Sequence, residues 1–502
     1  DGLIQVTTDG GNNWTKVDNI AGVPERTYVN HIITSQHDKN VAYVTFNHHR
    51  YGDFHPYVYK TSDGGKTWKA ITNNLPERGT SYTIAEDHVN KDLLFVGTEF
   101  GLFVSIDGGA KWVQMKAGLP TIAVKDLEIQ KRENDLILAT FGRGFYVLDD
   151  YTPLRHLKRD DLDKPAVIFP VKDAWMFIQS QPLGVRGKGF QGESFFTTPN
   201  PKVGAVFTYY LKDDIKTIKE KRRAAEAEKI KKGEAPTYPS PDSLRLEDEQ
   251  PAPHLLFTVT DESGNDVRRL KAPAKKGLKR IVWDFRTSPF GPINFTPFDE
   301  SFAFSSPDQG YFALPGTYKV SLSKFEDGVY TDLTEPQSFK AMTLNTATLP
   351  ATDKKALDDF SKKIAELSRV VAATDQYRGE LVNKVRYLKQ AVIETPKQSL
   401  DLSKALQDVE KRLNAVNRQL NGDASVARRE FETTPSINGR IGYVIGSLWN
   451  TTAAPTQTQL NSYQIAAKQF TPVYNEIKAI ATEVKRLEDI LEKNGAPYTP
   501  GR

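Results

Sequence analysis

The residues best suited to chemistry lie in three loops within the first 150 residues. The first loop, His48–His55, contains three histidines together with Arg50 and Asp53. The other two loops hold Glu99 and Arg143 at equivalent places in the surrounding sequence. Carboxylates and guanidinium groups bind charged or hydroxylated ligands through charge-assisted hydrogen bonds. The four charged residues are therefore candidate ligand-binding groups.

A metal site is the first alternative for the histidine-rich loop. His48, His49, Asp53 and His55 have donor atoms that suit zinc or copper. However, they share one short loop, and no His-x-x-x-His spacing on a helix accompanies them. We therefore expect loop histidines exposed to solvent, and no bound metal.

Glycoside hydrolysis is the second alternative, because it needs two carboxyl groups about 5–10 Å apart. Asp53 and Glu99 are the only such pair that we place on one face, so they are the catalytic candidates. An ion pair between Glu99 and Arg143, joining neighbouring repeats, is an equally good use of both groups. No Ser-His-Asp order, nucleophile elbow, P-loop, dinucleotide fingerprint or nucleic-acid module is visible in the sequence. We expect no cofactor.

An eight-residue pattern, Ser/Thr-x-Asp-Gly-Gly-x-x-Trp, occurs three times in the same region. The segments are Thr7–Trp14, Thr61–Trp68 and Ser105–Trp112. Intervals of 54 and 44 residues between them suit four strands per repeat. A catalytic residue is not needed once per repeat, so we expect a turn-stabilising role for the aspartates and a packing role for the tryptophans. These residues are Asp9, Asp63, Asp107, Trp14, Trp68 and Trp112.

The three segments resemble the Asp-box (BNR) repeats of sialidases, xyloglucanase-type glycosidases and sortilin-type propellers. The longer phrases, Gly97–Trp112 and Ala139–Arg155, resemble a family of large exported bacterial proteins that are often labelled sortilin-like or glycosyl hydrolase. The resemblance implies a β-propeller whose Asp boxes join the third and fourth strands of each blade. Loops between the second and third strands then lie on the opposite, ligand-binding face. The arginine motif and the tyrosine–glutamate pair of sialidases are not recognisable.

The rest of the chain indicates a multidomain protein, mainly β and then α. We expect the C-terminal blades of a propeller in 1–150, with further blades upstream of this chain, and a connecting segment in 151–200. Alternating strands in 201–345 predict a β-sandwich of immunoglobulin or fibronectin type, interrupted by a charged insertion at 212–250. Apolar residues at three- and four-residue spacing predict an antiparallel helical bundle in 351–495, before a tail at 496–502.

Composition limits the function classes. The 502 residues carry a net charge of only +4, which does not predict a nucleic-acid partner. There is no cysteine, so disulfides and thiolate chemistry are excluded. No apolar run is long enough to span a membrane. From the resemblance we expect an exported protein that is periplasmic, outer-membrane-associated or extracellular.

Two functions therefore remain open. The first is a non-catalytic binding or scaffold protein whose propeller face binds a protein, peptide or glycan. The second is a glycoside hydrolase with its site on the same face. We favour the first, because fold alone establishes no activity and no catalytic set is complete.

Overall fold

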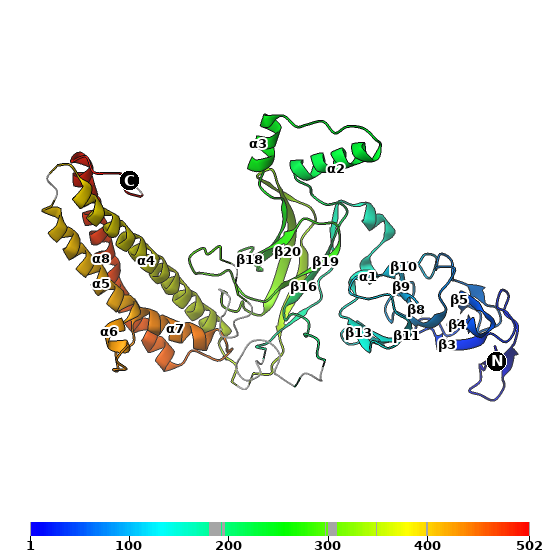
Figure 1. Ribbon diagram of the computed structural model, residues 1–502. Coiled ribbons are helices and arrows are strands. Elements are labelled where there is room, and N and C mark those ends of the chain that lie inside the picture. The colour runs from blue at the N-terminus through cyan, green and yellow to red at the C-terminus, as the bar shows by residue number, and fades with distance from the viewer. Residues whose placement is uncertain are drawn as a thin grey trace. The chain divides into compact units, whose positions relative to one another are not determined.

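The structure, a computed structural model, describes residues 2–179, 192, 196–296, 298–299, 309–347, 349–397 and 400–500. It is mostly β-structure, followed by a C-terminal helical region (Figure 1). The chain forms two compact units. The first comprises Asp1–Pro170, Thr208–Ile215 and Lys275–Lys279, and the second comprises Val171–Phe207, Lys216–Ala274 and Arg280–Arg502.

Consecutive antiparallel sheets make up most of the first unit. Their strands are β1 (Ile4–Val6), β2 (Thr15–Val17), β3 (Tyr28–Thr34), β4 (Ala42–His48), β5 (Asp53–Thr61), β6 (Lys69–Ala70), β7 (Ser81–Glu86), β8 (Leu94–Thr98), β9 (Gly101–Ser105), β10 (Val113–Met115), β11 (Val124–Gln130), β12 (Asp135–Thr140) and β13 (Phe145–Leu148). The sheets are β1-β2, β3-β4-β5-β6, β7-β8-β9-β10 and β11-β12-β13. Within each sheet, every strand pairs with the next one in the chain, so the sheets are meanders.

Strand β8 shows why the inner strands are continuous apolar runs. Successive side chains of a strand point to opposite faces of the sheet. Leu94 and Val96 belong to a core cluster that includes Tyr43 of β4. Phe95, between them, belongs to a different cluster that includes Val124 of β11. Both faces of this sheet are therefore buried against neighbouring sheets.

The three Ser/Thr-x-Asp-Gly-Gly-x-x-Trp turns join β1 to β2, β5 to β6 and β9 to β10, and they share one hydrogen-bond pattern. In the second turn, Thr61 Oγ1 accepts from Gly65 N at 3.0 Å and donates to Asp63 Oδ1 at 2.9 Å. The same carboxylate oxygen accepts from Thr67 N at 2.9 Å. The corresponding bonds in the other two turns are 2.7–2.9 Å long. Each aspartate thus closes its own turn.

In the second and third turns, the second glycine allows a close approach to the preceding sheet. Gly109 has φ of 91°, and a Cβ there would lie 3.0 Å from Ile71. Gly65 has φ of 85°, and a Cβ there would lie 2.7 Å from Val6. A side chain at either position would meet both an unfavourable backbone conformation and a steric clash.

The three tryptophans do not share one environment. Trp112 is 2% exposed, and its Nε1 donates to Ile71 O at 2.8 Å. Trp68 packs against the cluster that contains Ile4 of β1. Trp14 is 57% exposed, and its Nε1 donates only to Gly11 O within its own turn. The expectation of a packed tryptophan under every turn is therefore wrong for Trp14, because no earlier sheet of this chain covers it.

The segment after β13 is anchored to the sheets by a buried ion pair. Arg155, in helix α1 (Pro153–His156), donates to both carboxylate oxygens of Asp87, at 2.8 and 2.7 Å. The hydroxyl of Tyr151 donates to the same carboxylate at 2.6 Å. Burial alone would raise the pKa of Asp87, but these hydrogen bonds outweigh it and the pKa is lowered. The segment expected as a connector also contains η2 (Arg159–Asp163), β14 (Ala166–Ile168) and β15 (Ala174–Met176).

Two sheets follow in the chain. Their strands are β16 (Ala205–Leu211), β17 (His254–Thr260), β18 (Asp266–Pro273), β19 (Gly277–Trp283), β20 (Gly316–Glu326), β21 (Val329–Asp332) and β22 (Gln337–Thr343). One sheet has the order β14-β16-β19, and the other has the order β15-β22-β20-β17-β18 with β21 paired to β20. Phe207 of β16 packs against Phe257 and Phe339, and Trp283 of β19 packs against Tyr318. The two sheets therefore face each other across an aromatic core.

The charged insertion forms two helices, α2 (Ile218–Lys231) and α3 (Pro241–Glu249). Helix α2 has no buried residue. Arg222 links the two helices, because its Nη2 donates to Glu247 at 2.8 Å. The charged stretch Lys216–Lys232, with few apolar residues, predicts a solvated helical excursion, and the structure has a surface helix pair held by charge.

The C-terminal helices are α4 (Lys354–Glu394), α5 (Leu402–Asn421), α6 (Ala424–Ala427), α7 (Ile437–Leu448) and α8 (Gln457–Lys493). Helices α4, α5 and α8 lie side by side (Figure 1). Their apolar faces, together with that of α7, form a single core cluster. Helix α4 has 41 residues, and the apolar residues from Leu357 to Val392, at three- and four-residue spacing, predict one long helix here. Within the described ranges, no helix combines the length and the apolar character that a membrane crossing requires.

Candidate functional site

The four charged candidates lie on three hairpins at the same position in successive sheets. Arg50 is in the 3₁₀ turn His49–Tyr51, and Asp53 begins β5. Glu99 lies between β8 and β9, and Arg143 lies between β12 and β13. In a meander, successive connections lie at opposite ends of the sheet. The hairpin before β5 or β9 and the Asp-Gly-Gly turn after the same strand are therefore at opposite ends. The candidates are thus on the end opposite the Asp-Gly-Gly turns, and we call the three loops the hairpin end.

Asp53 is held by its own hairpin. Its carboxylate accepts from the hydroxyl of Tyr57 at 2.6 Å and from His55 N at 2.9 Å. Partial burial opposes ionisation, but these two hydrogen bonds outweigh that effect and lower the pKa of Asp53. The group is a carboxylate at neutral pH, able to accept hydrogen bonds but not to give up a proton.

Two histidines of the first loop, His48 and His55, contact side chains other than histidines. His48 Nδ1 lies 3.0 Å from Thr27 Oγ1, and its ring stacks on Tyr51 with centroids 4.4 Å apart. His55 meets the edge of Tyr57. Across the described residues, no group of three or more His, Cys, Asp or Glu side chains is arranged to hold a metal ion.

The expected ion pair between Glu99 and Arg143 is absent: within the described part of the chain, no salt bridge or hydrogen bond joins the two side chains. Arg143 is exposed between Gly142 and Gly144, both of which have positive φ. At such an exposed tip, water solvates the guanidinium well and little is gained by pairing it. The alternative in which both charges are used to join repeats is therefore wrong for this structure, and Arg143 is free to meet a ligand.

Exposed aromatic side chains accompany the charges on the same hairpins. They are Tyr51, Phe54, Phe100, Phe141 and Phe145, of which Phe141 is 72% exposed and Phe145 is 77% exposed. Two cations lie over this set: Arg78 is 5.5 Å from the ring of Phe54, and Lys125 is 5.6 Å from that of Phe141. Exposed rings flanked by cations offer stacking and cation–π contacts to a ligand.

The sequence places aromatic residues in the same loops as the charges, but only the charged residues were chosen as ligand-binding candidates. A signal for them was present, since Phe100 adjoins Glu99 and Phe141 lies two residues before Arg143. A large apolar side chain that recurs in equivalent loops, where turn residues are expected, indicates a surface that binds something.

General acid catalysis has no support in the charge states of the carboxyl groups. A glycosidase acid must remain protonated near neutral pH, which requires a raised pKa. Every described Asp or Glu whose pKa is displaced has it displaced downward, Asp53 among them. Asp53 is thus a carboxylate at neutral pH and not a proton donor.

Comparison with known proteins identifies no family. No family model matches the chain, and no curated protein matches it. Solved structures align with it only loosely. An ancestral GH74 enzyme is 24% identical over 23% of this chain and 14% of its own, with a TM-score of 0.20.

Two other solved structures align over more of the chain. The GH74 enzyme of Niastella koreensis is 12% identical over 64% of this chain and 39% of its own, with a TM-score of 0.22. PorZ, a surface component of the type-IX secretion system of Porphyromonas gingivalis, is 13% identical over 66% and 40%, with a TM-score of 0.22. The chain thus spans well under half the length of the structures that it matches, and the TM-scores are too low to carry an argument.

Proposed function

We propose that this chain is the ligand-binding part of an exported, non-catalytic protein, with the hairpin end as its binding surface. The first unit is then a run of Asp-box blades from a sortilin-like β-propeller, and the second is an immunoglobulin- or fibronectin-like spacer followed by a helical docking arm. The ligand is a protein, peptide or glycan, met outside the cytoplasm. One observation carries the proposal: three equivalent hairpins each present exposed aromatic rings beside charged groups.

The exposed rings need a reason, because a buried position would be more favourable for them. Moving a phenylalanine side chain out of water is worth about 1.5–3 kcal/mol. Phe141 and Phe145 forgo most of that gain in the free protein. A ligand that stacks on these rings recovers it, and the adjacent Arg143 supplies hydrogen-bond donors for a carboxylate or hydroxyl group.

The balance of charge on the hairpins supports binding without catalysis. Asp53 is ionised and hydrogen-bonded in place. Arg50 and Arg143 are exposed cations. Groups fixed in one protonation state position a polar ligand well, whereas hydrolysis needs a carboxyl group that releases and takes back a proton.

The test is ligand binding by the intact chain on glycan and peptide arrays, followed by titration calorimetry of the hits. We expect Phe100→Ala combined with Phe141→Ala to weaken binding about tenfold or more, through lost stacking. Tyr238→Ala is the control, because Tyr238 is an exposed aromatic on the charged insertion, away from the hairpins. Equal effects of the two changes would contradict the proposal.

The glycoside hydrolase alternative is tested in the same preparation. Turnover of a panel of aryl glycosides by the wild-type chain, lost on Glu99→Gln, would replace binding with catalysis as the function. We expect no turnover.

A further inference from the structure

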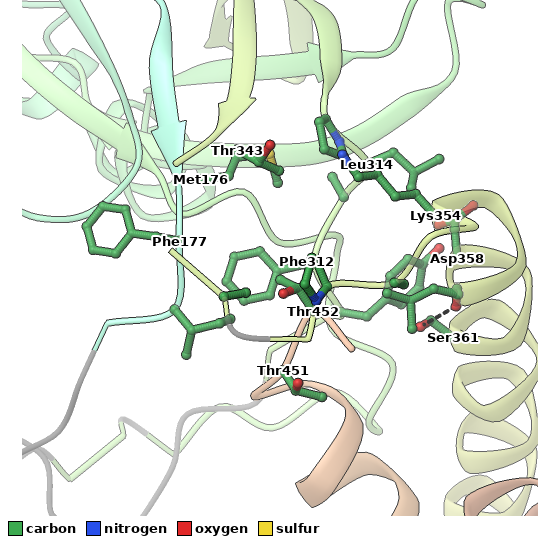
Figure 2. A pocket seen from close by; sticks show the side chains of 18 of the residues that line it. Met176, Phe177, Phe312, Leu314, Thr343, Lys354, Asp358, Ser361, Thr451 and Thr452 are labelled. Carbon is green, nitrogen blue, oxygen red and sulfur yellow. Dashed lines mark hydrogen bonds between the residues drawn. The ribbon is translucent and has the colours of Figure 1, made fainter. Parts of the chain in front are cut away.

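The second unit contains a cavity that the proposed function does not use. Its volume is about 220 Å³. It lies where the end of β15, the segments before β20 and after β22, the first turns of α4 and the end of α7 come together. Figure 2 shows Lys354, Asp358 and Ser361 along α4 on one side, with Met176, Phe177 and Thr343 across from them. A cavity of about 150 Å³ is enough for a benzene molecule, so this one accepts a single ring with a short chain.

The walls of the cavity are fixed by hydrogen bonds. The buried Arg286 donates to Gly310 O at 3.1 Å and to Trp449 O at 3.2 Å, and its guanidinium lies 4.3 Å from the ring centre of Phe312. Ala351 N donates to Thr452 O at 2.8 Å, which ties the segment before α4 to the segment after α7. The cavity is therefore preformed, and a ligand that enters it has little ordering of the protein to oppose its binding.

Most of the lining is apolar, but it includes the hydroxyl of Tyr311. Tyr311 is 8% exposed and lines the cavity, and its hydroxyl makes no hydrogen bond within the described part of the chain. Burial, together with the nearby Asp358 carboxylate, raises the pKa of Tyr311 to about 12. The hydroxyl therefore stays protonated and is available as a donor. An acceptor on a ligand in the cavity would take a hydrogen bond from it.

Two charged side chains line the cavity, and only one of them has an ion-pair partner. Asp358 is neutralised by Lys362, whose Nζ lies 2.6 Å from the carboxylate. Lys354, the first residue of α4 and four residues before Asp358, makes no ion pair or hydrogen bond with the described residues. The charge left without a partner is thus positive, and it sits at the positive end of a long helix.

We propose that this cavity binds a small amphipathic carboxylate, with a one-ring or similarly sized apolar body inside and its carboxylate at Lys354 and the Tyr311 hydroxyl. The apolar walls take up the body of the ligand. Lys354 and Tyr311 supply one charged and one neutral donor to its acid group. The site is independent of the hairpin end, so it stands or fails separately from the proposed function.

The test uses three probes with the same apolar body: 4-phenylbutyrate, 4-phenylbutan-1-ol and 4-phenylbutylamine. Binding to the full chain is measured by titration calorimetry and ligand-observed NMR. For the carboxylate we expect a dissociation constant near or below about 1 mM, as a ligand of this size allows. We expect the alcohol to bind at least about tenfold more weakly and the amine more weakly still. Tighter binding of the amine, equal binding of all three, or no binding by any of them would overturn the proposal.

Variants locate the site. Lys354→Gln should weaken carboxylate binding about fivefold or more and bring it near that of the alcohol. Lys355→Gln is the matched control, because Lys355 pairs with Asp359 at 2.8 Å and does not line the cavity.

Tyr311→Phe should weaken binding of both the carboxylate and the alcohol, whereas Tyr443→Phe, at an exposed position of α7, should not. Ala347→Trp, which fills the cavity from its exposed rim, should abolish binding of the carboxylate. Unchanged carboxylate binding in the Lys354, Tyr311 and Ala347 variants would place the ligand elsewhere and refute the proposal.

Discussion

The two ends of the sheets in the first unit are built on opposite principles. At one end, the turns repeat both sequence and geometry, and the same three hydrogen bonds recur within about 0.3 Å of each other. At the hairpin end, the position in the sheet repeats but the residues do not: Asp53 begins a strand, Glu99 lies in a tight turn and Arg143 lies at a glycine-flanked tip. The turns that repeat in sequence have a structural role, whereas the loops that differ from sheet to sheet are the ones proposed to bind a ligand.

The strongest test of this contrast removes a tryptophan from the repeated end. Trp112→Ala should lower the free energy of unfolding of the first unit by about 3–5 kcal/mol, because a fully buried indole leaves a cavity and an unpaired Ile71 carbonyl. Trp14→Ala should change it by less than about 0.5 kcal/mol, because that ring is largely in water. Urea unfolding followed by circular dichroism measures both. Equal losses would contradict the difference in burial between the two rings.

The next test removes one hydrogen bond from a turn. Thr61→Val keeps the shape of a buried side chain but leaves the N–H of Gly65 without its acceptor. We expect a loss of about 1–3 kcal/mol, the cost of an unsatisfied buried donor. Thr67→Val, in the same turn but exposed, should cost less. Ligand affinity of the folded protein should stay the same in both variants, and a selective loss of affinity would make the turn part of a binding site.

Acid should weaken the Asp-Gly-Gly turns. Hydrogen bonds from the side chain and the backbone of Thr67 lower the pKa of Asp63 from 3.8 to about 2. A carboxyl group with a depressed pKa stabilises the folded state above its unfolded pKa, and this stabilisation is lost as the pH falls toward the folded value. The difference in melting temperature between wild type and Asp63→Asn should therefore be constant above about pH 5 and shrink between pH 4 and pH 2. A difference that does not vary with pH would show that the Asp63 carboxylate is not stabilised by its turn.

Much of the backbone was predictable from the sequence. The turn pattern with its glycines, the alternating strands of the second unit and the three- and four-residue spacing of the helices all depend on local chemistry. The 41-residue α4 and the surface helices of the insertion followed from such patterns. The exposure of Trp14 did not, because it depends on which sheet lies next to it and not on its own turn.

The hairpin end was only half predictable. The repeat alignment placed Arg50, Asp53, Glu99 and Arg143 in equivalent loops, but pairing between charges depends on distances that no spacing reveals. The same limit hid the cavity of the second unit. Tyr311, Lys354 and Thr452 are far apart in the sequence and meet only through tertiary packing.

The smallest effect expected on stability is also the sharpest test of the hairpin end. Because no ion pair joins Glu99 to Arg143, the changes Glu99→Gln and Arg143→Ala should each alter the free energy of unfolding by less than about 0.5 kcal/mol. In a double-mutant cycle the two changes should add, because side chains that do not interact have no coupling energy. A coupling energy above about 0.5 kcal/mol would show that the two side chains interact, contrary to the structure.

Ligand affinity should behave differently from stability: each change should weaken binding several-fold, since each removes a charge that an acceptor or donor on the ligand would use. A hairpin end that tolerates both changes without losing affinity would be surface, and its divergence from repeat to repeat would then reflect the absence of constraint rather than a binding site.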